Sequence, residues 1–360
     1  MTAPGPGSDL DAIVRLADFE APAKARMTPD GYDYVAGGSF DELTLADNLT
    51  AWSRYRLLPR VLVDTERIET TTRVLGRPAL PFGVAPMAHH RLAHPEGEVA
   101  TLAGAAAEGA IFTLSTVSSR SIEDVAAAAP DARRWFQLYV HRDRPVARAL
   151  VERAAACGFE AIVLTVDLPV LGVRDRDRRH GFDPGPDAFG NFPRQADYEG
   201  DWDDLLDMRH VALTWDDLGE IASWSTLPLV VKGILEPDDA RRAVDQGAAA
   251  VWVSNHGGRQ LDRVAAPIDA LAAIVDAAGV GAEVYVDGGV RRGTDVVTAL
   301  ALGARAVFVG RPIMWALAVG GSDGVRHALR LLLDETERSL ALLGVRSPAE
   351  LDRRYVRSAW

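Results

Sequence analysis

The chain has 360 residues, with 39 Lys and Arg against 51 Asp and Glu, a formal charge of −12 at pH 7 and one cysteine. The acidic balance excludes a protein that binds nucleic acid through a basic surface, and one cysteine excludes an intrachain disulfide scaffold. No stretch approaches the ~20 apolar residues of a membrane-spanning helix, and the first residues do not resemble a secretory signal. We therefore expect a soluble cytoplasmic enzyme without a membrane partner, preceded by a flexible leader at residues 1–9.

Eight short segments from residue 81 onwards are almost continuously apolar. They span residues 81–86, 111–115, 135–140, 161–167, 228–233, 249–255, 283–289 and 306–312. Such runs are typical of parallel strands that are buried on both faces, and segments with helical spacing of apolar residues lie between them. Eight β–α units within about 240 residues predict an α/β protein with a (β/α)8 TIM barrel, although a doubly wound sheet would show the same alternation.

Three segments do not follow this alternation of strands and helices. Residues 10–80 predict an N-terminal helical cap, and residues 325–343 predict an amphipathic C-terminal helix. About sixty residues separate the fourth and fifth expected strands, so residues 172–212 predict a lid loop at the catalytic end, against the alternative of a disordered insertion without a role. Because no second core is evident, we expect residues 10–360 to form a single domain.

Polar groups follow several of the expected strands, where the functional groups of a barrel gather. The segments Asp287–Arg291 and Val309–Pro312 place glycines and arginines after the last two strands, which predicts a phosphate pocket. Lys232, at the end of the fifth strand, requires an anionic partner. It could form a Schiff base, bind phosphate or face an anionic cofactor ring, and the spacing leaves these three roles open.

The segment Ser254–Asp262, SNHGGRQLD, carries the most specific signal in the chain. His256 and Arg259 can face one small acid, so that the guanidinium holds a carboxylate while the imidazole takes a proton. Asp167 is a candidate to orient that histidine. The alternative is a plain turn in which Arg259 pairs with Asp262.

These motifs together resemble the FMN-dependent 2-hydroxy acid oxidase/dehydrogenase family, which includes glycolate oxidase, lactate oxidase and the mandelate-oxidising enzymes. SNHGGRQLD is similar to the active-site signature of that family. Six further motifs match in order: AHPEGE (93–98), FQLYV (136–140), LTVD (164–167), VVKG (230–233), DGGVRRGTDV (287–296) and VGRP (309–312). The resemblance implies an FMN-binding barrel, flavin-dependent oxidation of an (S)-2-hydroxy acid to the 2-oxo acid, and a homotetramer.

The resemblance also implies a role for each residue that matches a family motif. His256 would be the base, for the α-carbon proton or the hydroxyl proton, and Asp167 would orient it and stabilise its imidazolium. The substrate would be held by Arg174, Arg259, Tyr34 and Tyr139. Lys232 would lie beside the N1–C2=O edge of the flavin. The remaining FMN contacts would come from Ala88, Ser115, Gln137, Thr165, Asp287, Gly289, Arg291, Gly310 and Arg311.

The size of the substrate side chain is predicted from Val117, which stands where a glycolate oxidase carries a bulky tryptophan. A smaller residue admits a larger group, and Met87, Leu171 and Phe182 could form apolar walls. The pattern is most similar to bacterial mandelate or 4-hydroxymandelate oxidases. We therefore expect an aromatic acid of that type, against the alternative of a short aliphatic acid such as lactate or glycolate.

The electron acceptor is expected to be O2, with H2O2 as product, because the loop after the fourth strand is polar and no haem domain precedes the barrel. The first alternative is a dehydrogenase that uses a quinone or protein acceptor. From another class, a non-redox FMN or phosphate-binding barrel isomerase remains open, as does an idle scaffold. His89, His90 and His94 lack further ligands, so no metal site is expected.

Overall fold

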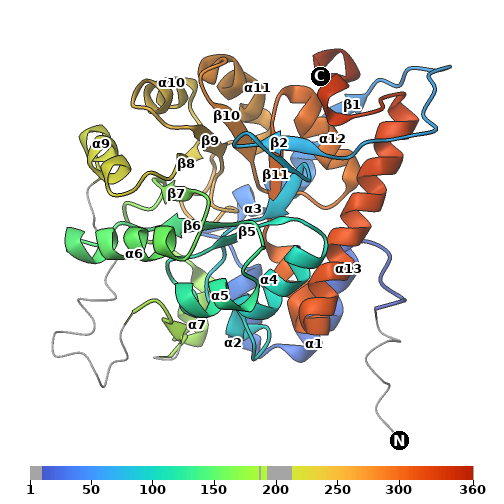
Figure 1. The fold of residues 1–360 in the computed structure, drawn as a ribbon. Coiled ribbons are helices and arrows are strands. Elements are labelled where there is room, and N and C mark those ends of the chain that lie inside the picture. The colour runs from blue at the N-terminus through green and yellow to red at the C-terminus, as the bar shows by residue number, and fades with distance from the viewer. Residues whose placement is uncertain (1–9, 186–187, 193–212, 360) are drawn as a thin grey trace, which may run out of the picture.

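The computed structural model describes residues 10–185, 188–192 and 213–359. Eight parallel strands close into a barrel in the order β10-β11-β4-β5-β6-β7-β8-β9 (Figure 1). Their bounds are β4 (Phe82–Val84), β5 (Ile111–Leu114), β6 (Arg134–Leu138), β7 (Ile162–Thr165), β8 (Leu229–Ile234), β9 (Ala250–Val253), β10 (Glu283–Val286) and β11 (Ala306–Val309). Each strand extends at most one residue beyond its predicted segment, and the predicted (β/α)8 barrel is confirmed.

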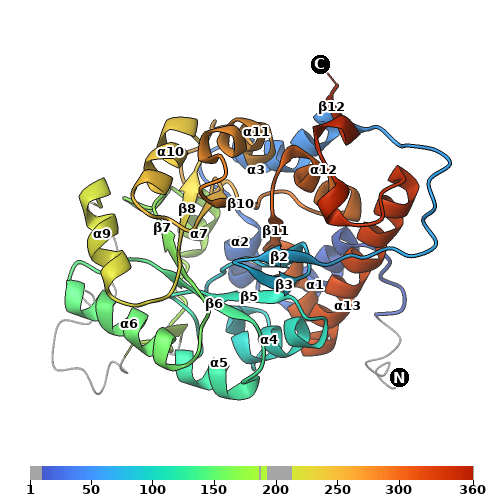
Figure 2. The same cartoon turned by 45° about the horizontal axis from the view of Figure 1, so that its top comes forward.

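Helices surround the strands, as Figure 2 shows. They are α4 (Glu98–Ala107), α5 (Ile122–Ala128), α6 (Arg144–Ala156), α9 (Trp215–Ser223), α10 (Pro237–Asp245), α11 (Pro267–Ala278), α12 (Gly293–Leu302) and α13 (Arg311–Leu343). Because each helix covers the outer face of the sheet, the strands are buried on both faces, which explains their nearly continuous apolar sequence. The long α13 is broken at Gly320 and Gly321, and its second part is the predicted C-terminal helix.

The barrel interior is filled by a cluster of large aromatic side chains. Trp135, Trp252, Tyr285 and Phe308 are almost completely buried, and the rings of Trp252 and Phe308 have centroids 4.0 Å apart. A hairpin of β2 (Thr72–Val74) and β3 (Arg77–Ala79) contributes to the same cluster. The inside of the barrel is therefore a packed core, and any ligand space must lie beyond the carboxyl ends of the strands.

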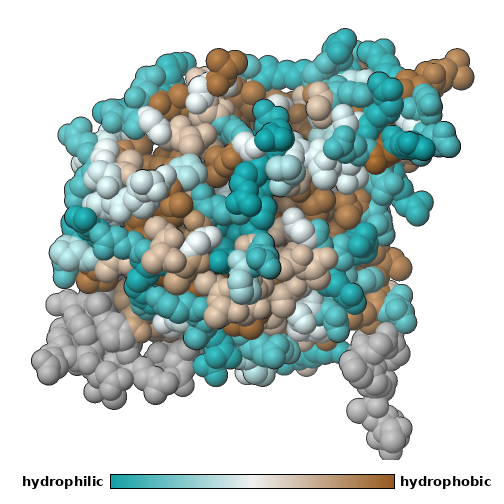
Figure 3. Space-filling view, viewed as in Figure 1, coloured by the Kyte–Doolittle hydropathy of each residue, from teal (hydrophilic) through white to brown (hydrophobic). Residues whose placement is uncertain are grey.

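The N-terminal extension is helical as predicted, with α1 (Glu20–Arg26), α2 (Pro29–Ala36) and α3 (Leu43–Thr50). It also contains β1 (Tyr55–Leu57), which pairs with β12 (Val356–Ser358) near the other end of the chain. The sequence did not predict this pairing, because three-residue strands have too short a pattern to be recognised. The loop between β1 and β2 projects at the upper right of Figure 1, where Figure 3 shows hydrophobic side chains.

The predicted lid loop is only partly described. It contains α7 (Asp175–His180), which packs against α2, and residues 188–192, which lie against the loop after β5. Residues 186–187 and 193–212 lie outside the described residues, as does the predicted leader at 1–9. None of the described helices combines the length and apolar character that crossing a bilayer requires.

Candidate active site

A cavity of about 770 Å³ lies at the carboxyl ends of the barrel strands. Its walls come from the N-terminal extension, the loops after the barrel strands and α7. The predicted site residues that line it are Tyr34, Ala88, Ser115, Val117, Gln137, Tyr139, Thr165, Arg174, Lys232, His256, Arg259, Asp287, Gly289, Arg291, Gly310 and Arg311. Asp167 is the one predicted site residue that does not line the cavity. It contacts Nδ1 of His256 on the side of the ring away from the cavity.

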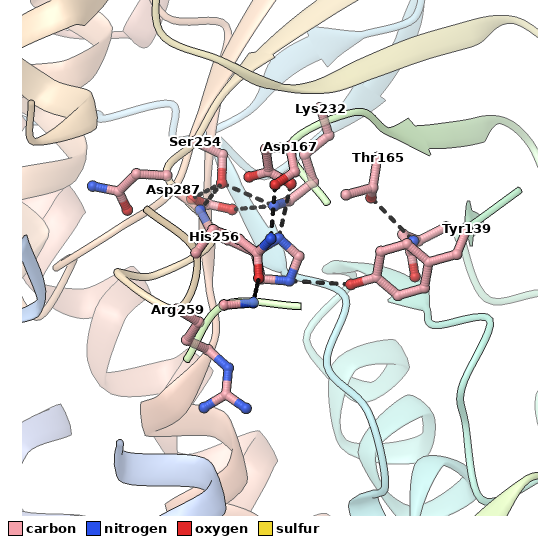
Figure 4. Close-up of polar contacts among 12 residues, drawn as sticks. Tyr139, Thr165, Asp167, Lys232, Ser254, His256, Arg259 and Asp287 are labelled. Atoms are coloured by element: carbon pink, nitrogen blue, oxygen red, sulfur yellow. Dashed lines mark hydrogen bonds and ion pairs between the residues drawn. The ribbon is translucent and has the colours of Figure 1, made fainter. Parts of the chain in front are cut away.

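His256 lies between a carboxylate and a phenol (Figure 4). Its Nδ1 donates to Oδ1 of Asp167 at 2.9 Å, which leaves Nε2 unprotonated in the neutral ring, 3.1 Å from the Tyr139 hydroxyl. Burial lowers the pKa of His256, and the charge of Asp167 offsets this effect only in part. A neutral imidazole whose free nitrogen faces the cavity is suited to accept a proton.

The backbone of the signature segment explains its two glycines. His256, Gly257 and Gly258 all have positive φ, at 59°, 66° and 73°. A Cβ atom on Gly257 would lie 2.8 Å from Nη1 of Arg311, and one on Gly258 would lie 2.7 Å from the backbone nitrogen of Leu45. The unusual backbone at His256 is thus held by close packing on both following residues, as is common at functional sites.

Lys232 is buried at the floor of the cavity, and the anionic partner that the sequence predicted for it is Asp287. Its Nζ lies 3.2 Å from Oδ2 of Asp287 and 2.8 Å from Oγ of Ser254, which itself donates to Oδ1 of Asp287 at 2.7 Å. The ammonium, the carboxylate and the hydroxyl therefore form one buried polar cluster at the cavity floor. No role was predicted for Ser254, although its position directly after β9 could have indicated one.

Gln137 organises a polar edge of the cavity. Its Oε1 accepts from the Ser115 hydroxyl at 3.2 Å, and its Nε2 donates to Oγ1 of Thr165 at 3.0 Å. The three residues come from the carboxyl ends of β5, β6 and β7. The predicted set of flavin-edge contacts therefore lies together as one hydrogen-bonded row, with Ala88 lining the cavity from the loop after β4.

The opposite end of the cavity is strongly positive. Burial lowers the pKa of Arg291 to about 10 and that of Arg311 to about 9, with neighbouring arginines adding to the effect at Arg311. Arg291 donates to the Val290 carbonyl, and Arg311 donates to the carbonyls of Val35 and Gly37. Across the described ranges, neither guanidinium has a carboxylate within ion-pair distance. Two buried guanidiniums that lack an ion-pair partner among the described residues make this end a suitable site for an anion.

The two arginines of the predicted carboxylate clamp, Arg174 and Arg259, lie close together. Arg259 donates to the carbonyls of Tyr34 and Gly37, and its guanidinium lies 4.7 Å from the centroid of the Tyr34 ring. Burial lowers the pKa of Arg174 to about 10, with a further contribution from Arg259, because the two cations lie near each other. An anion between them would relieve this repulsion.

The alternative turn, in which Arg259 pairs with Asp262, is wrong. Asp262 instead accepts from the backbone nitrogens of Thr44 at 2.7 Å and Leu43 at 3.3 Å, at the start of α3. It therefore satisfies free N–H groups at a helix N-terminus and leaves Arg259 directed to the cavity.

An apolar wall lies beside Arg174 and Arg259. It is formed by Met87, Val117, Leu171 and Phe182, and the ring of Phe182 stacks on that of Tyr34 with centroids 4.3 Å apart. His89 joins this wall, whereas His90 and His94 do not line the cavity. In the part of the chain that the structure describes, no three His, Cys, Asp or Glu side chains are arranged to hold a metal ion.

Comparison with known proteins finds close relatives over nearly the whole chain. Residues 23–358 match the model of the FMN-dependent dehydrogenase family. An L-lactate oxidase of Nostoc sp. is 47% identical, covering 96% of this chain and 99% of the relative. Glycolate oxidase 1 of Zea mays is 45% identical, covering 96% of each chain. A crystal structure of mandelate oxidase with benzoyl-formic acid is 44% identical, with a TM-score of 0.88, covering 96% of this chain and 98% of that one.

Proposed function

The chain belongs to the FMN-dependent dehydrogenase family and is an FMN-dependent oxidase of 2-hydroxy acids, and from this premise we propose that it oxidises an aromatic (S)-2-hydroxy acid of the mandelate or 4-hydroxymandelate type. The products would be the 2-oxo acid and H2O2, with O2 as the electron acceptor. The observation that carries the aromatic preference is the apolar wall of Val117, Leu171 and Phe182 beside the paired arginines.

The residues of the cavity fit FMN. The uncompensated guanidiniums of Arg291 and Arg311 would hold its phosphate, together with the backbone at Gly289 and Gly310. Asp287 would hold the ribityl chain. The hydrogen-bonded row of Ser115, Gln137 and Thr165 offers donors and acceptors to the edge of a flat heterocycle, and Ala88 would lie against its face. When bound, FMN supplies a two-electron acceptor for the substrate.

The substrate would be oriented by its charge. Arg174 and Arg259 would bind its carboxylate, and Tyr34 and Tyr139 would donate hydrogen bonds to the carboxylate or the hydroxyl. The two arginines come from different segments that lie close together, so both guanidiniums could contact one carboxylate. A substrate held there would present its hydroxyl-bearing carbon to His256, which lines the same cavity.

His256 would then remove a proton from the substrate, either the α-carbon proton or the hydroxyl proton. It would do so through Nε2, the nitrogen that faces the cavity. Asp167 stabilises the resulting imidazolium through the hydrogen bond to Nδ1. Lys232 contributes a buried positive charge that favours negative charge developing nearby. The proposed catalytic set is therefore His256, Asp167, Lys232 and Tyr139.

The experiment that tests the substrate class is steady-state turnover with four acids and peroxide detection. The enzyme is assayed with (S)-mandelate, (S)-4-hydroxymandelate, (S)-lactate and glycolate. We expect the highest kcat/KM with an aromatic acid and one H2O2 per 2-oxo acid formed. A preference for lactate or glycolate would favour the second candidate, an oxidase of short aliphatic acids, which the 47% identity to an L-lactate oxidase supports.

The acceptor is tested separately. The bound flavin is reduced with substrate without air, and then exposed either to O2 or to a quinone. Rapid reoxidation by O2 is expected. Slow reoxidation by O2 with rapid reoxidation by the quinone would instead establish a dehydrogenase. If no 2-hydroxy acid bleaches the flavin absorbance, a non-redox barrel would be favoured.

We also propose that residues 10–360 form one domain, with a cap at 10–80 and a lid at 172–212, in a cytoplasmic homotetramer. The pairing of β1 with β12 supports the single domain, because it joins the cap to the C-terminal end. Sedimentation velocity of the holoenzyme measures the oligomer, and limited proteolysis with and without substrate measures protection of the lid.

A further inference from the structure

His89 is a polar side chain in an otherwise apolar part of the cavity wall. Its ring lies 5.7 Å from the Tyr34 ring and meets the Phe189 ring edge-on at 5.3 Å. Its backbone N–H donates to the Val117 carbonyl at 3.2 Å, so it neighbours the residue that we expect to admit the substrate side chain. His89 has a φ of 57°, in the left-handed region that few residues other than glycine adopt, and only 6% of its surface is exposed.

The tautomer of His89 follows from one contact. Its Nδ1 lies 3.1 Å from the carbonyl oxygen of Ala188, which can only accept, so Nδ1 must carry the proton. In the neutral ring Nε2 is then a hydrogen-bond acceptor. No group of the described residues hydrogen-bonds to Nε2, and the side chain lines the cavity.

The charge state of His89 is fixed by its surroundings. The pKa of His89 is lowered to about 4: burial is the main cause, the hydrogen bond to Ala188 opposes the shift, and the charges of His90, Arg259 and Arg174 add to it. Nε2 therefore remains an acceptor at neutral pH, and the ring adds no positive charge that could compete for the substrate carboxylate.

The segment that holds this tautomer is itself anchored. Asn191 donates from Nδ2 to the carbonyls of Ser115 and Thr116, and its Oδ1 accepts from the backbone of Ile122 at 2.9 Å. The Gly190 backbone donates to the Ser118 carbonyl at 2.8 Å. The carbonyl of Ala188 is thus presented by a short segment fixed to the loop after β5, which also carries Val117.

We propose that Nε2 of His89 is a specificity-determining acceptor that selects a substrate whose aromatic side chain carries a hydrogen-bond donor, such as a phenolic hydroxyl. This inference rests on the proposed aromatic 2-hydroxy acid and names its substituent. A buried acceptor left unpaired costs free energy, so a ring without a donor is bound less well than one with a donor.

The experiment compares hydroxyl with fluorine on the same ring. The holoenzyme is assayed with (S)-3-hydroxymandelate, (S)-4-hydroxymandelate and the two fluoro analogues, and the hydroxyl/fluoro ratio of kcat/KM is taken at each position. The affinities of the corresponding 2-oxo acids are measured by perturbation of the flavin absorbance. We expect a hydroxyl preference of about five- to tenfold at one ring position in both measurements.

Variants assign the preference to His89. His89→Phe removes the acceptor and should bring the ratio near one, whereas His89→Gln supplies an amide oxygen and should retain part of it. His327→Phe is the matched control, because His327 also donates to a carbonyl, that of Ile13, and meets Phe19 edge-on, but it does not line the cavity. The ratio should be unchanged in that control.

The outcomes separate this inference from the proposed function. Ratios near one at both positions in the unaltered enzyme, or a preference that survives in His89→Phe, would overturn the role of His89 while leaving aromatic oxidation intact. Failure to turn over any aromatic acid would reject the proposed function. The binding ratio of the 2-oxo acids would then still decide whether His89 recognises a hydroxyl.

Discussion

Nδ1 of His256 lies 2.9 Å from Oδ1 of Asp167, and the two residues are 89 positions apart in the chain. The first follows β9 and the second follows β7, and β8 lies between these strands in the barrel. Gly233 lies within β8, and a Cβ atom on it would lie 2.7 Å from the Asp167 side chain. Because Gly233 has no side chain, the Asp167 carboxylate has room beside β8 and can reach His256.

Replacing the base should remove most of the turnover while FMN stays bound. His256→Ala is expected to lower kcat by about 10²–10⁴, because the proton acceptor is lost while the groups expected to hold the cofactor remain. Stopped-flow reduction of the bound flavin measures the loss, and the visible spectrum reports FMN content. Near-normal reduction would remove His256 from the role of base.

Asp167→Asn should change the pH profile in a defined direction. Although burial alone raises the pKa of Asp167, the charge of His256 and its hydrogen bond hold it below its usual value, so the carboxylate is charged at neutral pH. Removing this charge lowers the pKa of His256 further, because the imidazolium loses its partner. The acid limb of kcat/KM should move to lower pH while kcat falls. A limb displaced to higher pH would contradict this assignment.

Arg259→Lys should weaken the substrate carboxylate contact. The Arg259 guanidinium donates to two carbonyls through Nη1 and has further N–H groups for a carboxylate in the cavity. The ammonium of a lysine cannot reproduce this planar arrangement of donors. We expect KM to rise at least about tenfold with a smaller change in kcat, since a lost charge-assisted hydrogen bond costs about 1.5–3 kcal/mol. Arg263→Lys, at an exposed position nearby, serves as the control. Unchanged KM would count against the clamp.

Val117→Trp should narrow the space for the substrate side chain. A tryptophan at this position projects into the apolar wall, so kcat/KM for mandelate should fall relative to that for glycolate. The ratio of the two values in the variant and in the unaltered enzyme is the measurement. A ratio that does not change would show that the side chain of the substrate lies elsewhere.

Gly289→Ala tests the backbone of the phosphate end. Its φ is 79°, and a Cβ atom would lie 1.7 Å from the Asn48 carbonyl oxygen, so the segment must shift. We expect a loss of about 1–3 kcal/mol in the free energy of unfolding and weaker FMN binding. Gly76→Ala has a similar φ of 73° with open space around it, and should cost about 1 kcal/mol with FMN affinity retained. Thermal unfolding and FMN titration measure both variants.

Strand positions and most cavity residues could be predicted from the sequence, because local patterns encode them. Strands buried on both faces leave nearly continuous apolar runs, and the residues that follow them lie at one end of a parallel barrel by topology alone. Arg311 was predicted only as a phosphate ligand, whereas its guanidinium is also bonded to the carbonyls of Val35 and Gly37. Those contacts join segments that no local pattern relates.

The sequence by itself thus determined the eight β–α units and the set of residues gathered at the carboxyl end of the barrel. The single cysteine and the charge of −12 only excluded other classes. Tertiary structure decided which partner each group received: Asp287 and Ser254 for Lys232, and α3 rather than Arg259 for Asp262. It also separated His89, in the wall, from its neighbour His90. Side-chain direction and pairing depend on packing between distant segments, and spacing along the chain does not contain that information.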